Sequence, residues 1–319
     1  MQLPSPLDAI LPEVPGLLPA HEPLATCERC AMSVPTSPDR PVFTAAARCC
    51  TFHPKLVNFL VGQALQAGGP GASAIRRRLT QPDGLLPRGI EPPIRWKQEW
   101  SGDIAKKFGQ HEPLTCPYWV EGDLGCGIHP FRESVCRTWH CRIVRGGPGY
   151  DAWMAGRDLL RSTERMVAEA VEHDPAEHDG DWERYYIACA HRAAALDPSR
   201  FRTPRTERLL ERLREGAHRR DQPMPATPIP YVAAWKVRDD RVELESWSIY
   251  DPTFAPPWVF TFLSKLDGAT HWRDALRATA EEVDGVVSPD LAWQLWTRGL
   301  LAHPDEAVAA EPRIDVIPR

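Results

Sequence analysis

The chain has 319 residues and a formal net charge of −5, and 43% of its residues are hydrophobic and 25% charged. This composition is typical of a globular chain with room for about two domains, which excludes general disorder. The small acidic excess argues against affinity for nucleic acid or a membrane surface, both of which need a basic face. No run of 18 apolar residues predicts a membrane span, and the first residues show no secretory signal, so we expect a cytoplasmic protein.

The first half of the chain divides into a leader and a cysteine-rich domain. Residues 1–24 hold six of the 33 prolines and predict an extended leader. Residues 25–150 form the cysteine-rich domain. Within it, apolar spacing predicts a helix over 55–66 that is ended by the glycines of 68–71. Prolines and glycines predict loops over 81–93 and 146–149.

The next segment is helical. Residues 151–222 show apolar residues at helical spacing and predict three helices, with a polar loop from His173 to Gly180 between the first two. Cys189 shares a face with aromatic residues of the second helix, so we interpret it as a core residue. A linker rich in proline follows and ends at Pro230.

Residues 231–303 predict a small α+β C-terminal domain. Alternating residues indicate two strands, 232–237 and 242–249, and helices follow over 259–266, 272–283 and 289–299. This order resembles winged-helix modules, including the PqqD-like peptide-binding type. Eleven acidic residues against seven basic ones exclude a DNA-reading surface, so we expect a peptide or protein partner. Residues 304–319 predict a loosely packed tail. The fold class is thus mainly α-helical with irregular loops, followed by this winged-helix-like unit.

Cysteine placement is the most informative feature of the sequence. Eight of the nine cysteines fall within residues 27–141 and form two quartets: Cys27, Cys30, Cys49 and Cys50, then Cys116, Cys126, Cys136 and Cys141. Cytosolic thiols are kept reduced, so such a concentration indicates metal ligation more than disulfides or core packing. We therefore predict one or two cysteine-ligated centres, although the spacing does not show which thiols share a site.

The spacing favours an iron–sulfur cluster, with a [4Fe–4S] cluster foremost, over zinc. Structural zinc sites usually show two short C-x(2–4)-C knuckles, and this chain has one, at Cys27 and Cys30. Adjacent cysteines such as Cys49 and Cys50 suit two different irons better than one tetrahedral ion. Pro117 after Cys116 is also typical of cluster cysteines. Zinc remains the alternative.

The segment 116–141 resembles the YkgJ-type cysteine-cluster family of zinc- or iron-chelating proteins. The resemblance rests on Cys116 followed by Pro and Tyr, then Cys126-Gly-Ile, Arg132, Cys136-Arg137 and Cys141, and it covers residues 25–145. Two features depart from the family pattern. Glu133 stands where a proline is usual, and the stretch between Cys30 and Cys49 is longer.

Arginine and tryptophan residues close to the cysteines in the sequence are expected to stabilise an anionic centre. Arg132 and Arg137 are expected to donate hydrogen bonds to it, because guanidinium groups stay charged and donate in a fork. Trp119 and Trp139 are expected to shield it from water, which affects the redox potential of a cluster.

Three histidines close to the cysteines in the sequence are alternative ligands. They are His53, His129 and His140. Imidazole can replace thiolate on iron or on zinc, so each of them could complete a site that lacks a fourth cysteine.

The sequence therefore predicts a metal-binding protein and leaves two alternatives. Similarity of the cysteine pattern to the flagellin lysine N-methylase group implies an enzyme that modifies a peptide or protein, with methyl transfer as its reaction. A structural zinc scaffold for protein interaction is the other. No catalytic triad or radical S-adenosylmethionine triplet is present, so the sequence leaves open whether the chain is an enzyme.

Overall fold

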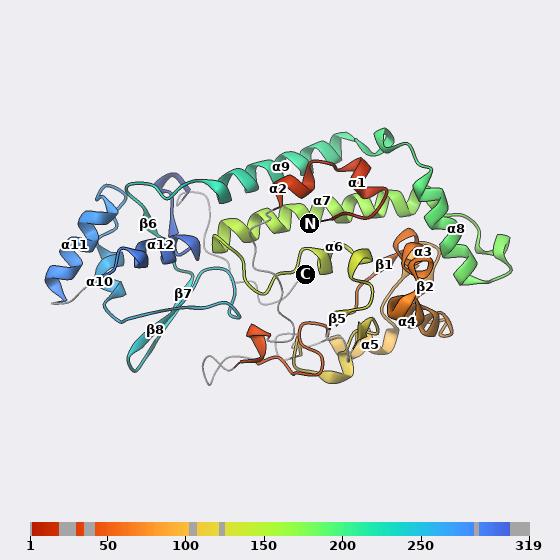
Figure 1. The fold of residues 1–319 in the computed structure, drawn as a ribbon, viewed down its shortest axis with the longest axis horizontal. Helices are drawn as coiled ribbons and strands as arrows, with labels where there is room; N and C mark the ends of the chain where they lie inside the picture. The colour runs from red at the N-terminus through yellow and green to blue at the C-terminus, as the bar shows by residue number, and fades with distance from the viewer. Residues whose placement is uncertain are drawn as a thin grey trace.

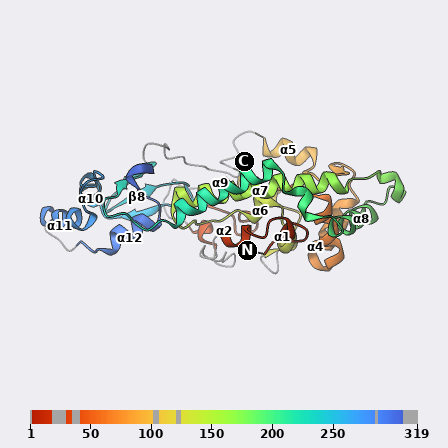
Figure 2. The same ribbon diagram turned by 90° about the horizontal axis from the view of Figure 1, so that it is seen from above.

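The computed structural model describes residues 2–18, 30–34, 42–101, 107–120, 125–283 and 287–306. Helices dominate this part of the chain, and its strands form small antiparallel sheets of two or three strands each. The molecule is elongated, and two long helices, α7 (Gly146–Val171) and α9 (Pro204–Asp221), lie side by side along its length (Figure 1, Figure 2). The prediction of a mainly helical fold with small β elements is confirmed.

The N-terminal segment packs against this helix pair. It forms two short helices, α1 (Leu7–Ile10) and α2 (Val14–Leu17). The Arg202 guanidinium donates to the Ile10 carbonyl at 3.2 Å and pairs with Glu13 at 3.0 Å. The predicted extended leader is therefore wrong for residues 2–18, because burial of apolar residues at near-helical spacing outweighs the proline content. Residues 19–24 lie outside the described part. The side chains buried in the main core are Leu3, Leu7, Ile10, Leu11, Val14 and Leu18.

One end of the molecule is built around α3 (Asn58–Ala67), which packs against α8 (Trp182–Ala194). The predicted helix over 55–66 is thus confirmed, preceded by the short strand β1 (Leu56–Val57). The glycines at 68 and 69 end α3 and also begin the next helix. Gly68 has a φ of 74°, which stops α3, but Gly69 already begins α4 (Gly69–Leu79). The predicted loop over 81–93 contains the strands β2 (Leu85–Leu86) and β3 (Gly89–Ile90), which form a sheet in the order β1-β3-β2.

The three helices predicted for the central segment are present as α7, α8 and α9. Asp181 caps α8 by accepting from the Glu183 and Arg184 amides, and Thr203 caps α9 in the same way. Cys189 is fully buried on α8, as expected of a core residue. The loop predicted for residues 146–149 is wrong. These residues form the first turn of α7, which starts after Arg145 in the left-handed conformation (φ 68°).

The C-terminal unit has its own core. Strands β7 (Ala234–Arg238), β8 (Arg241–Glu245) and β9 (Thr253–Ala255) form an antiparallel sheet with β8 in the centre. Helices α10 (Val259–Ser264), α11 (Trp272–Glu282) and α12 (Asp290–Thr297) pack on it, and β10 (Leu301–Ala302) pairs with β6 (Ile229–Pro230). The two predicted strands and three helices are confirmed, with the second strand shorter. The strand β9 and the short β6–β10 ladder are additional elements that the alternation of residues did not predict.

Four of the nine cysteines lie between α4 and α7, namely Cys116, Cys126, Cys136 and Cys141. The short elements of this region are α5 (Ile94–Trp100), the hairpin of β4 (Trp119–Val120) and β5 (Gly125–Cys126), and the single-turn helix α6 (Ser134–Arg137). α6 lies against the long helix α7. Such short elements have little regular structure of their own, so their positions depend on side-chain packing and on hydrogen bonds to distant segments.

Candidate metal centre

Eight of the nine cysteines lie in the described part of the chain, and Cys27 lies outside it. No disulfide joins any two of the eight. Seven of them lie at six places in short elements and loops: Cys30 before a 3₁₀ turn, Cys49 and Cys50 together in the turn 45–51, Cys116 before β4, Cys126 in β5, Cys136 in α6 and Cys141 before α7.

Cys30, Cys49 and Cys141 pack into one aromatic cluster. The rings meet edge to face, with the centroids of Phe108 and Trp139 5.2 Å apart. Cys141 thus lies with two cysteines of the first quartet, although its place in the sequence groups it with the second. The other members of the cluster are Met32, Phe43, Phe52, Trp100, Phe108, Trp139, Ile249 and Tyr250.

Cys50, Cys116 and Cys126 contact the main hydrophobic core. The Cys116 amide donates to the Cys50 carbonyl at 2.6 Å, which joins two cysteine-bearing segments directly. The β4–β5 hairpin pairs Trp119 with Cys126, and the Trp119 amide donates to the Cys116 carbonyl at 3.0 Å. Backbone hydrogen bonds therefore hold these three cysteines near one another.

The thiols are close enough to affect one another's ionisation. Burial raises the pKa of Cys116, and the neighbouring thiolates of Cys126 and Cys49 raise it further. Burial and the Glu133 carboxylate raise the pKa of Cys136. For Cys49, the hydrogen bond with the Cys50 thiol is the largest cause of a raised pKa, followed by burial. These thiols need a cation to become thiolates at neutral pH, since metal binding supplies the missing positive charge.

The sulfurs are near one another without forming a tight tetrahedron. Within the described ranges, the one set of three ligating side chains whose donor atoms lie within 4.8 Å of one another contains no cysteine. Four thiolates on one zinc ion would place their sulfurs about 3.8 Å apart, given Zn–S bonds of about 2.3 Å. In a multi-iron cluster each thiolate binds a different iron, so the sulfurs stand farther apart.

Buried hydrogen-bond donors near the cysteines have no acceptor among the described residues. They are Tyr118 Oη, Trp119 Nε1, Arg137 Nε, Trp139 Nε1 and Tyr250 Oη. Each unsatisfied donor costs about 1–3 kcal/mol. A bound anionic group would supply the acceptors. The sulfur atoms of a thiolate-ligated centre could accept these hydrogen bonds, so this set of donors fits such a centre.

The two predicted supporting arginines differ in their surroundings. The Arg137 side chain is buried, and its terminal nitrogens donate to the carbonyls of Gln2, Pro130 and Arg132. Its Nε is the donor left without an acceptor. Half-buried Arg132 donates through Nε to the His129 carbonyl at 3.2 Å. Both arginines donate to backbone carbonyls, but buried Arg137 also interacts electrostatically with Cys136, so it is the better placed of the two to support the cysteines.

Two buried carboxyl groups accept hydrogen bonds from the backbone of the α6 turn that carries Cys136, and neither was predicted as part of the site. Glu133 caps α6, accepting from the Val135 amide at 2.7 Å and the Cys136 amide at 2.9 Å. Glu164, on α7, accepts from the Ser134 amide at 3.1 Å. Burial and the neighbouring Glu133 charge raise the pKa of Glu164 to about 8. Helical spacing on α7 places Glu164 among buried residues, but only the packing of α6 on α7 brings it to the backbone of the α6 turn.

The three candidate histidines lie in different environments. His53 is buried between Trp96 and Tyr118, with Nδ1 3.0 Å from the Pro54 carbonyl and Nε2 without a partner among the described residues. The His140 ring lies 4.1 Å from that of Trp153. Burial lowers the pKa of both to about 4, so both are neutral in the folded protein at neutral pH. For His129 burial lowers the pKa as well.

A scan against models of protein families found no match for this chain, and searches of curated proteins and of solved structures found none either. The resemblance to the YkgJ-type family therefore stays a prediction from the motif. None of the helices in the described ranges is both long and apolar enough to cross a membrane.

Proposed function

We propose that this chain is a metal-binding protein of the YkgJ type, in which the cysteines of the N-terminal half hold a thiolate-ligated centre, with an iron–sulfur cluster favoured over zinc. Two observations carry the proposal: thiols from separate segments influence one another electrostatically, and buried donors in the same segments have no acceptor among the described residues. We call this site the cysteine centre, and its predicted ligands are the eight cysteines between residues 27 and 141.

Charge supports an anionic centre at this place. The unpaired donors would stabilise negative charge on sulfur, and buried Arg137 adds a fixed positive charge near Cys136. The aromatic cluster would keep water away from Cys30, Cys49 and Cys141, and exclusion of water is one determinant of the potential of a redox-active cluster.

The spacing of the cysteines in the sequence favours iron–sulfur over zinc, because the chain has one short C-x2-C pair where structural zinc sites usually have two. A single zinc ion would require four thiolates to close to about 3.8 Å from one another. The described thiols influence one another's ionisation. No three of them have sulfur atoms that all lie within 4.8 Å of one another. When bound, such a cluster would supply electron transfer or Lewis acidity, and the chain's own residues would supply ligands, charge and shielding.

Anaerobic purification of the full chain tests this proposal. We expect a brown protein that contains iron and acid-labile sulfide. Cys136→Ala should lose most of both, whereas Cys189→Ala should keep its iron and sulfide and is the control, because the buried Cys189 sulfur lies 3.8 Å from the Val171 carbonyl oxygen and 3.8 Å from His173 Nδ1. Full metal retention in Cys136→Ala would contradict the assignment. A colourless protein with stoichiometric zinc would support the structural scaffold instead.

The C-terminal unit is proposed to be a winged-helix-like module that binds a peptide or protein. β7 is an edge strand of its sheet, and two of its apolar side chains, Trp235 and Val237, are more than half exposed. The alternative function, modification of a peptide, would use this surface to present the substrate.

That alternative is tested by co-expressing the chain with peptides encoded by neighbouring genes and measuring the peptide masses by mass spectrometry. Unchanged peptide masses with an intact cysteine centre would count against it.

A further inference from the structure

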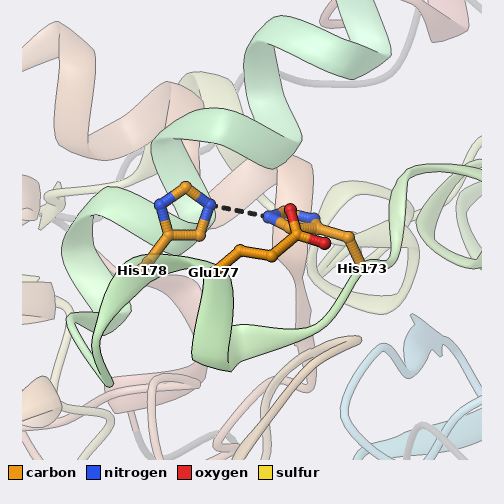
Figure 3. Close-up of side chains that lie close together, drawn as sticks. All are labelled: His173, Glu177 and His178. Atoms are coloured by element: carbon orange, nitrogen blue, oxygen red, sulfur yellow. Dashed lines mark hydrogen bonds between the residues drawn. The ribbon is translucent and has the colours of Figure 1, made fainter.

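A second group of metal-ligating side chains lies between α7 and α8, apart from the cysteines in the sequence. His173, Glu177 and His178 point toward one another (Figure 3). The Nε2 atoms of the two histidines are 2.8 Å apart, and the three ligating atoms all lie within 4.8 Å of one another. The first histidine follows the end of α7, and the other two residues belong to a 3₁₀ turn, Pro175–His178.

The surrounding structure fixes the orientation of His173. Its Nδ1 lies 3.1 Å from the Val171 carbonyl oxygen, to which it can donate a proton, and this leaves Nε2 with its lone pair facing His178. Its ring stacks on Tyr185 with centroids 4.4 Å apart. A backbone carbonyl behind one ring nitrogen is the usual arrangement for a metal-ligating histidine.

The turn that carries the other two ligands is also preformed. Asp174 caps it by accepting from the Ala176 amide at 2.9 Å, and Pro175 restricts its first residue. Asp179 ends it in the left-handed conformation, with φ 55°. The two ligands therefore reach the same point as His173 without a change in the backbone.

The ion pair between Glu177 and Arg192, which would compete with metal binding, is weak. Arg192 lies 3.4 Å from the Glu177 carboxylate, and both side chains are about half exposed (47% and 54%). Exposed ion pairs contribute about 0–1 kcal/mol, so a divalent cation can replace the guanidinium. Two imidazole nitrogens on one tetrahedral ion would stand about 3.3 Å apart, so binding requires the rings to separate by only about 0.5 Å.

We propose that His173, Glu177 and His178 bind one divalent late first-row transition metal ion, with Zn²⁺ preferred, rather than Mg²⁺ or Ca²⁺. The ion would join the end of α7 to the 3₁₀ turn that precedes α8. Imidazole favours zinc, nickel and copper, whereas the hard cations prefer oxygen ligands only. Water would complete the coordination, since the site is partly exposed. This site does not depend on the cysteine centre.

The test counts zinc ions on the full chain by native mass spectrometry as Zn²⁺ is added to protein carrying whatever metal it was purified with. We expect the wild type to take up one more ion than His178→Gln and Glu177→Gln, with affinity for that ion weakened at least about 100-fold in these variants. His218→Gln is the matched control, because His218 is an exposed histidine on α9. Equal uptake by all four proteins would overturn the proposal.

A second readout separates this site from the cysteines. Co²⁺ bound here should give no thiolate-to-metal charge-transfer absorption, because its ligands are nitrogen and oxygen. The difference between wild type and His178→Gln should persist in a Cys136→Ala background. If Cys136→Ala abolishes that difference, or if the lost Co²⁺ signal is a thiolate band, the extra ion belongs to the cysteine centre and the proposal fails. If no metal co-purifies with the cysteines, the comparison with His178→Gln still decides this site.

Discussion

The carboxylate of Glu133 holds the backbone of Cys136, because its Oε1 accepts the Cys136 amide hydrogen at 2.9 Å. Its other oxygen accepts from the Val135 amide at 2.7 Å, so Glu133 is the N-cap of the helix turn that presents the thiol. This contact gives a physical reason for a glutamate where the resembled family has proline, since proline has no side-chain acceptor to cap α6.

Replacing the cap should weaken both the fold and the cysteine centre. We expect Glu133→Ala to lower the free energy of unfolding by about 1–2 kcal/mol, the usual cost of losing an N-cap, and to reduce bound metal. Glu133→Gln keeps one acceptor oxygen and should lose less of both. Urea unfolding and metal analysis measure the two effects. Equal metal content in Glu133→Ala and wild type would show that the cap does not position Cys136.

Close packing of α4 on the loop after Cys126 gives a second prediction. A Cβ on Gly71 would lie 2.2 Å from the Gly127 carbonyl oxygen, so Gly71→Ala must push that loop away. We expect a loss of about 1–3 kcal/mol in the free energy of unfolding, as for other overpacked sites, together with lower metal content. Gly16→Ala is the control, because nothing lies within 4 Å of its added Cβ. Similar unfolding curves for the two variants would contradict the close contact.

The raised pKa of Glu164 predicts a pH dependence of stability. The carboxyl ionises near 4.5 in the unfolded chain and near 8 in the folded protein. Between these values the folded state keeps a proton that the unfolded state releases, so stability falls as pH rises from about 4.5 to about 8. Glu164→Gln removes this loss and should gain stability relative to wild type over that range, on the order of a few kcal/mol. Urea unfolding at pH 5 and pH 8 measures it, and a constant difference would disprove the assignment.

The lowered pKa of His53 predicts the opposite dependence of stability on pH. This pKa is lowered to about 4 by burial, while the unfolded value is 6.5. Below 6.5 the unfolded state binds a proton that the folded state does not, so stability falls as pH drops from about 6.5 to about 4, by up to about 3 kcal/mol. His53→Gln should show a shallower loss, measured by urea unfolding over this range. His140 titrates in the same direction and is present in both proteins, so it cancels in the comparison. Parallel pH profiles would argue against a neutral buried His53.

Local periodicity was sufficient to predict α3, the three central helices, and two strands and three helices of the C-terminal unit, but it did not predict α4 or α5. Apolar spacing gave α3, α8, α9 and the strands β7 and β8, because the period of the apolar residues decides which face of a regular element is buried. The same spacing identified Cys189 as a core residue. The distribution of cysteines also identified residues 27–141 as the candidate metal-binding region, because eight of the nine cysteines fall there, a concentration that core packing alone does not explain.

Which of these side chains meet depends on packing between segments that are distant in the chain. Cys141 joins Cys30 and Cys49 in the aromatic cluster, Glu164 reaches the helix of Cys136, and the proline-rich N-terminus is buried. None of these contacts is local, since they involve irregular segments that have no period of their own and take their positions from the long helix α7. Their energies come from burial and hydrogen bonds between residues far apart in sequence, which the pattern of neighbouring residues does not contain.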